Sequence, residues 1–96
     1  MIKEIVSKNS FKQDFKKATK QGFIKEAEIA EIDKIIQLLA NNQPLEPRHR
    51  NHFLKHDYAG FSECHIKPNL LLIYKVEADI LYLTRIGRHQ DIFKKY

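Results

Sequence analysis

The stretch that decides the fold is "FSECHIKPNLLLIYKVEADILYLTRI", residues 61–86, in which three runs of β-branched, aromatic and leucine residues alternate with two short turns. We expect strands over residues 61–66, 70–76 and 80–86, because such runs suit the half-buried surface of a sheet. The intervening segments "KPN" and "EAD" are short enough to join antiparallel neighbours. The stretch therefore predicts a three-stranded antiparallel meander.

The chain before this meander predicts one strand and two helices. Residues 2–6 include the β-branched Ile2, Ile5 and Val6 and end at a turn-prone segment, which indicates a short first strand. Residues 10–21 predict a helix, since Ser10 and Gln13 have the spacing of a capping box and Gly22 ends the run. The second helix has an apolar stripe at helical spacing, formed by Ile29, Ile32, Ile35, Ile36 and Leu39.

These elements occur in the order β-α-α-β-β-β, which predicts an α+β fold. Residues 43–47 contain two prolines and cannot continue a helix, so they connect the helices to the meander. The expected architecture is an antiparallel sheet with two helices packed on one face and the other face left free. At 96 residues the chain is expected to form a single domain over residues 1–96.

Composition narrows the class of protein. With 43% hydrophobic and 30% charged residues, the chain is typical of a globular protein and not of a disordered or fibrous one. The net charge of +5 favours a polyanionic partner such as nucleic acid. Cys64 is the single cysteine, so no internal disulfide forms, and no apolar run approaches the ~18 residues of a membrane span. We expect a cytoplasmic protein without membrane contact or an export signal.

All five histidines follow residue 48, and they raise the question of a metal site. His52 and His56 are four residues apart, and Cys64 adjoins His65. Adjacent strand residues point to opposite faces of a sheet, so this pair cannot converge on one tetrahedral ion. The spacing therefore favours neither a metal nor another cofactor.

The histidines also suit RNA cleavage. Attack of a 2′-hydroxyl on the neighbouring phosphate needs a base, an acid and cations, and it needs no metal. A histidine, with a reference pKa near ~6.5, can serve as acid or base at neutral pH. Strand alternation puts Arg85 on the side of Leu81 and Leu83, which we interpret as the face without helices. Gly87 then permits a bend that returns His89 toward that face.

At this point the second half resembles a known family. "NHFLKHDYAGFSECHIKPNLLLIYKV" followed by "LTRIGRHQDIF" looks like the YafQ branch of the RelE superfamily of bacterial toxins, the mRNA interferases of type II toxin–antitoxin modules. The resemblance covers residues 38–93. Three elements, similar to "DHxL", "HxxPDxxLIY" and "GxHxxLF", occur in order and at the family's spacing. The resemblance implies a RelE-like fold.

The resemblance also implies the site residues. Those around the scissile phosphate are expected to be His52, His65, Arg85, His89 and Phe93. Residues expected to bind the substrate are Arg48, Arg50, Lys67, Asn69 and Arg88. The last histidine is the family's acid and the terminal aromatic positions a base, although Phe93 could equally plug the core.

Two positions depart from the family's pattern. Asn69 replaces the acidic residue after the proline, and Asn51 replaces the aspartate before the first histidine. An asparagine can hydrogen-bond a hydroxyl or a phosphate but cannot act as a general base. His65 is then the candidate base and His52 the residue that orients the substrate.

The function implied is a metal-independent endoribonuclease that cleaves mRNA, on the ribosome, without a cofactor. Expected partners are mRNA, the ribosome and a DinJ-like antitoxin, which would contact operator DNA so that the toxin meets DNA only indirectly. Two alternatives stay open. One is a catalytically weakened homologue that still binds RNA or the ribosome, and the other is an interaction protein whose basic surface serves an acidic antitoxin.

Overall fold

A computed structural model describes residues 1–93 of the chain. Its elements are β1 (Glu4–Ser7), α1 (Asn9–Lys20), α2 (Glu26–Ala40), the 3-10 turn η1 (Pro47–His49), β2 (His52–Phe53), the 3-10 turn η2 (His56–Tyr58), β3 (Ser62–Lys67), β4 (Leu70–Glu77), β5 (Ile80–Gly87) and α3 (His89–Ile92). The α+β class and the order of the predicted elements are confirmed. The two-residue strand β2 and the short helix α3 were not predicted.

The sheet has the strand order β1-β5-β4-β3-β2. Strands β3, β4 and β5 form the predicted antiparallel meander, and β2 adds an antiparallel edge. However, β1 runs parallel to β5, so the sheet is mixed and not wholly antiparallel. Short turns dictate antiparallel pairing of consecutive strands, whereas β1 and β5 are far apart in the sequence, so no short turn constrains the direction in which they pair.

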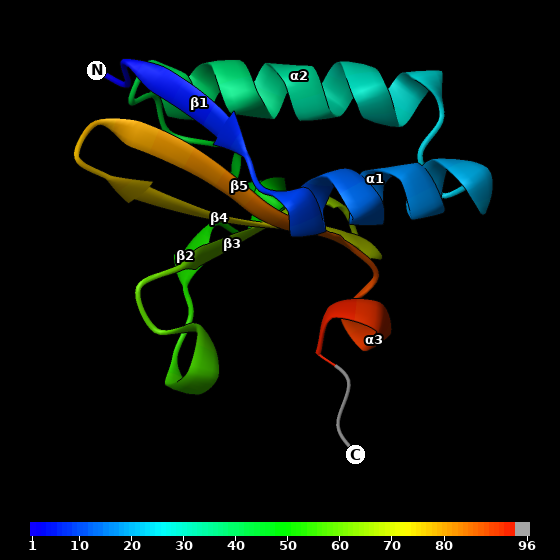
Figure 1. Cartoon of the computed structure of the whole chain (residues 1–96). Helices are drawn as coiled ribbons and strands as arrows, with labels where there is room; N and C mark the ends of the chain where they lie inside the picture. The colour runs from blue at the N-terminus through cyan, green and yellow to red at the C-terminus, as the bar shows by residue number, and fades with distance from the viewer. Residues whose placement is uncertain (94–96) are drawn as a thin grey trace.

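Both long helices cover one face of the sheet, as predicted (Figure 1). Ile32 and Ile35 of α2 are buried there against residues of β3, β4 and β5. Ile29 is 46% exposed, so the predicted apolar stripe begins one turn later than expected. No helix among residues 1–93 is long and apolar enough to cross a membrane.

The first helix starts differently from the prediction. Its N-cap is Lys8, and the Ser10 hydroxyl donates to the carbonyl of Thr84 at 2.6 Å, so the predicted capping box of Ser10 and Gln13 is wrong. The hydroxyl instead ties α1 to β5. A carboxylate caps α2, where Glu28 accepts a hydrogen bond from the backbone N–H of Lys25 at 2.8 Å.

A β-bulge interrupts the alternation of β5. Ile73 lies opposite Arg85, whereas the next residue, Tyr74, lies opposite Leu83. Thr84 is therefore the extra residue on the bulged strand. Beyond it, the residues that face the helices are shifted by one position.

The bulge at Thr84 changes which neighbours in β5 share a side of the sheet with Arg85. Leu81, Leu83 and Ile86 all belong to the core beneath the helices, so Arg85 does not share the side of Leu81 and Leu83 as predicted. It lies opposite Ile73, on the face without α1 and α2. The predicted face is correct, and the predicted parity is wrong.

The second face, called the open face below, is not left free as expected. Its small apolar cluster contains Leu71, Ile73 and Ile92, with Leu54, Tyr58, Phe61 and Phe93 packed against it. Figure 1 shows α3 and the loop between β2 and β3 on this side of the sheet, away from α1 and α2. The apolar cluster leaves room beside it for polar side chains.

Candidate active site

The register of β3 places two candidate residues on the open face. Glu63 lies opposite Ile73, and His65 lies opposite Leu71. Directly opposed residues share a face, so both polar side chains lie beside the small apolar cluster. Cys64 points the other way and is fully buried, and burial raises the pKa of its thiol to about 12. Cys64 therefore belongs to the core beneath the helices.

Glu63 joins two of the predicted histidines. Its Oε1 lies 3.4 Å from Nε2 of His65 and 3.6 Å from Nε2 of His52. The residue is 6% exposed, and a buried carboxylate needs such partners. The sequence analysis missed Glu63. Its position two residues before His65 on a strand was the signal that could have placed it on the same face.

His52 reaches this cluster from the edge strand β2. Its Nδ1 lies 2.7 Å from the carbonyl oxygen of Arg50. A carbonyl can only accept, so Nδ1 carries a proton and Nε2 is the nitrogen that faces Glu63. The side chain of His52 is half exposed, so this nitrogen is open to a ligand from solvent.

His89 and Phe93 come from the C-terminal side of the open face. The two rings are 4.9 Å apart between centroids, and Phe93 also packs edge-on against Tyr58 at 5.4 Å. His89 is exposed, whereas Phe93 is half-buried in the small cluster. Phe93 thus packs in an apolar cluster and supports the candidate acid at the same time.

Arg85 is held by a carboxylate of α1. Its Nε donates to Oδ2 of Asp14 at 2.6 Å, and the backbone N–H of Ile86 donates to the same oxygen at 3.1 Å. The hydrogen bond with Asp14 raises the pKa of Arg85 above its usual value. Arg85 is therefore a fixed cation at the edge of the open face, with much of its charge balanced.

Lys67 is not brought to the site. A register shift between His65 and Lys67 places Lys67 opposite Leu70, which belongs to the core beneath the helices. Its Nζ lies 3.1 Å from a carboxylate oxygen of Glu28 in α2. Because this irregularity reverses the side of the sheet, Lys67 faces α2 in this structure, and its predicted role in substrate binding stays a prediction.

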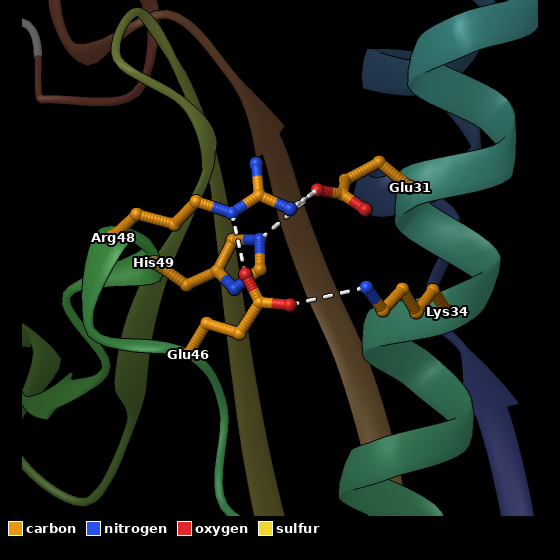
Figure 2. Close-up of polar contacts among 5 residues, drawn as sticks. All are labelled: Glu31, Lys34, Glu46, Arg48 and His49. Carbon is orange, nitrogen blue, oxygen red and sulfur yellow. Dashed lines mark hydrogen bonds and ion pairs between the residues drawn. The ribbon is translucent and has the colours of Figure 1, made fainter.

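Arg48 is also turned toward the helices. It donates from Nε to Glu46 at 2.7 Å and also contacts Glu31 of α2 (Figure 2). The hydrogen bond from Arg48, with a second from Lys34, holds the pKa of Glu46 at about 2. Arg48 therefore serves an ion-pair network in this structure, and its predicted role in substrate binding stays a prediction.

The remaining expected substrate-binding residues lie apart from one another. Arg88 pairs with Asp91 at 2.8 Å, and its guanidinium lies 4.4 Å from the ring centroid of Phe23. Arg50 is exposed just before β2, and Asn69 is exposed in the turn between β3 and β4. Among residues 1–93, no group of three or more histidine, cysteine, aspartate or glutamate side chains is placed to hold a metal ion.

The fold and this site define a class: a small basic α+β protein with imidazoles, a carboxylate and an arginine on one open sheet face. Residues 3–94 match the family model of YafQ, a bacterial toxin of type II toxin–antitoxin systems. The chain belongs to this toxin family. The resemblance drawn from the sequence is therefore confirmed.

Similar proteins of the family are known from other bacteria. The mRNA interferase toxin YafQ of Escherichia coli strain B / BL21-DE3 is 28% identical over 92 residues, which cover 95% of this chain and 96% of that protein. The structure of YafQ from E. coli BL21(DE3) matches with a TM-score of 0.82 and 29% identity, covering 93% of this chain and 96% of that one.

Two further solved structures are similar to this chain. A copper-bound mutant toxin from Helicobacter pylori matches with a TM-score of 0.85 and 36% identity over 97% of this chain and 100% of that chain. The E. coli DinJ–YafQ complex matches with a TM-score of 0.79 and 30% identity over 93% of this chain and 96% of that chain. The predicted fold is confirmed by these structures.

Proposed function

We propose that this protein is an mRNA interferase, the toxin of a type II toxin–antitoxin module, which cleaves mRNA by attack of a 2′-hydroxyl on the adjacent phosphate. The observation that carries the proposal is the cluster of His52, Glu63 and His65 on the open face. The names of the E. coli relatives support it. Acid–base chemistry of this kind needs no metal and no cofactor.

The proposed roles are assigned to residues of the open face. His65 takes the proton of the 2′-hydroxyl, the oxygen attacks phosphorus, and His89 protonates the departing 5′-oxygen. The products are a 2′,3′-cyclic phosphate and a 5′-hydroxyl. His52, which donates from Nδ1 to a backbone carbonyl and faces Glu63 with Nε2, holds the phosphate as an imidazolium. Arg85 adds a fixed positive charge, and Phe93 supports His89.

Glu63 has a separate role in this scheme. Each proton transfer of this type contributes typically ~10² to 10⁴ in rate, and its base must be oriented and its charge balanced. The Glu63 carboxylate touches both imidazoles, so it can orient His65 and stabilise the imidazolium that forms. Asn69 in the exposed turn is proposed to hydrogen-bond the substrate and not to accept a proton.

The proposed partners follow from the relatives. Two solved structures are complexes of E. coli YafQ with DinJ. We propose a DinJ-like antitoxin for this toxin, with operator DNA met only through that antitoxin. The proposed substrate is mRNA on a translating ribosome in the cytoplasm.

The test is cleavage of mRNA on programmed ribosomes, and of the same RNA free in solution with EDTA. The proteins are wild type, His89→Ala and Asn69→Asp. We expect discrete cuts with 2′,3′-cyclic phosphate ends from wild type, a loss of cutting in His89→Ala and faster cutting in Asn69→Asp. Absence of cuts from wild type, with or without ribosomes, would contradict the proposal.

A specific observation favours a second candidate, a toxin that binds RNA or the ribosome without cutting. Arg48, Arg85 and Arg88 are each paired with a carboxylate, and Asn69 replaces an acidic residue of the family. Growth arrest that survives His89→Ala would support this candidate. Arrest that His89→Ala relieves supports the enzyme.

A further inference from the structure

A hydrogen bond links α2 to the turn that precedes β2. His49, the last residue of η1, is 1% exposed, and its Nε2 lies 3.2 Å from Oε2 of Glu31 (Figure 2). A carboxylate can only accept, so Nε2 of a neutral His49 carries the proton. Its Nδ1 is buried and has no hydrogen-bond partner among the described residues. The His49 ring is thus oriented by a single polar contact.

The carboxyl of Glu31 is well suited to accept the hydrogen bond that Nε2 of His49 donates. Burial raises the pKa of its carboxyl, but hydrogen bonds from His49 and Arg48 outweigh burial and hold the pKa of Glu31 below its usual value. Glu31 is therefore a carboxylate at neutral pH. Figure 2 shows Arg48 and His49 approaching it from the same turn, while Lys34 and Glu46 form the outer, exposed part of the network.

The turn η1, which His49 connects to α2, is followed directly by the residues that lead to the site. Arg50 follows His49 and has a φ of +47°, a left-handed conformation that costs a residue with a side chain energy. Such a conformation persists only where its surroundings enforce it. Here it ends η1, with the Arg50 N–H bonded to the Pro47 carbonyl at 3.0 Å. The carbonyl of Arg50 then meets Nδ1 of His52 at 2.7 Å.

We propose that the contact of Glu31 with His49 is a positioning device for His52. It holds the turn that presents the Arg50 carbonyl, which keeps a proton on Nδ1 of His52 and turns Nε2 toward Glu63 and the substrate. Glu31 and His49 are positioning residues, since neither belongs to the cluster on the open face. The functional part of this inference rests on the proposed RNA cleavage.

The proposed positioning of His52 determines which of its ring nitrogens carries the proton. A neutral histidine that makes no hydrogen bond favours the tautomer with its proton on Nε2. In a protein, the ring nitrogen that donates a hydrogen bond is the one that keeps the proton. In His52 the bonded nitrogen is Nδ1, so Nδ1 keeps its proton in the neutral ring, and Nε2 is the nitrogen that takes up the second proton when the ring becomes the imidazolium proposed above. If the turn loosens, Nδ1 loses its acceptor and the proton moves to Nε2.

The first test reads the ring of His52 directly, by long-range ¹H–¹⁵N NMR of histidine-labelled protein near pH 8. In wild type we expect the proton on Nδ1. In Glu31→Gln and His49→Leu we expect a shift toward the Nε2–H form. His49→Gln keeps a donor for Glu31 and is expected to restore most of the wild-type signal. Glu46→Gln, which removes a carboxylate from the exposed part of the network, is the matched control.

The second test measures cleavage with the same variants. A displacement of one reacting group can cost about 100-fold in rate, so we expect kcat to fall roughly tenfold to 100-fold in Glu31→Gln with KM nearly unchanged. A folded Glu31→Gln or His49→Leu that keeps the proton on Nδ1 of His52 overturns the inference, and so does an equal shift in Glu46→Gln. If wild type cleaves no RNA, the proposed function fails, and the NMR result still decides the positioning role.

Discussion

The two faces of the sheet share the strands β3, β4 and β5 but carry different kinds of side chain. Beneath α1 and α2, alternate residues of β3, β4 and β5 form a thick apolar core. On the open face, Leu71 and Ile73 of β4 form a thin buried cluster with Ile92 of α3, beside the polar group of His52, Glu63 and His65. Adjacent positions such as Cys64 and His65 therefore differ completely in environment.

This contrast separates stability from chemistry along one strand. Most of the buried apolar side chains are on the helix side, so that side supplies most of the hydrophobic free energy of folding. The open face can then carry groups that burial would penalise. Substitutions on the two faces should accordingly change different quantities, and the following predictions test this separation.

The largest expected effect is on the open face. His65→Ala should lower RNA cleavage by about 10² to 10⁴, because the proposed base is lost. Lys67→Ala is the control, since Lys67 lies two residues along the strand but contacts α2. An equal loss of cleavage in both variants would contradict the claim that only the open face carries the chemistry.

The next effect is on stability and compares neighbours in β4. Leu72 is fully buried in the core beneath the helices, and Leu71 is equally buried in the thin cluster of the open face. Leu72→Ala should lower the free energy of unfolding by about 2–5 kcal/mol. Leu71→Ala should cost less, because a thin cluster can close around the cavity more easily. Urea denaturation measures both, and a larger cost for Leu71→Ala would reverse the comparison.

The sequence predicts the helix side better than the open face. The meander and the two helices follow from residue types and spacing, which record what each segment buries. Two irregularities escaped this reasoning: the bulge at Thr84 and the register shift before Lys67. Each reverses the side of later residues without a distinctive residue type, so the surroundings of Arg85 and Lys67 could not be assigned correctly.

The site was predictable in its residue types but not in its contacts. His52, His65 and His89 were found from chemistry and family resemblance. Their partners were not, because contacts between distant segments, such as Arg85 with Asp14, leave no local pattern. Glu63 carries no motif of its own, and only its strand position two residues before His65 marks it as a neighbour of that ring.

A smaller effect should follow at Glu63. Glu63→Gln keeps the size of the side chain but removes the charge that faces both imidazoles. We expect cleavage to fall by roughly tenfold to 100-fold, less than for His65→Ala, because the proposed base is retained but less well oriented. The pH profile of cleavage should also change shape. A variant with wild-type cleavage at every pH would show that this carboxylate is only structural.

The smallest effect concerns the network that joins the two regions, since it links α2 to the turn before His52. Arg48 and then Lys34 hold the pKa of Glu46 at about 2, below its usual value of 4.5. A carboxyl whose pKa is lowered on folding stabilises the folded protein at any pH above its pKa in the unfolded chain, and this stabilisation is lost as the pH falls from about 4.5 toward 2.

The difference in melting temperature between wild type and Glu46→Gln should therefore be present at pH 6 and shrink toward pH 2. It should be small because the pair is exposed and screened by solvent, and high salt should reduce it further. The side chain of Glu46 bonds Lys34 and Arg48, and only its backbone carbonyl, which the variant retains, bonds His49, so cleavage should be unchanged in this variant at neutral pH. A loss of cleavage there would mean that the exposed part of the network, and not the buried contact of Glu31 with His49, holds the turn before His52.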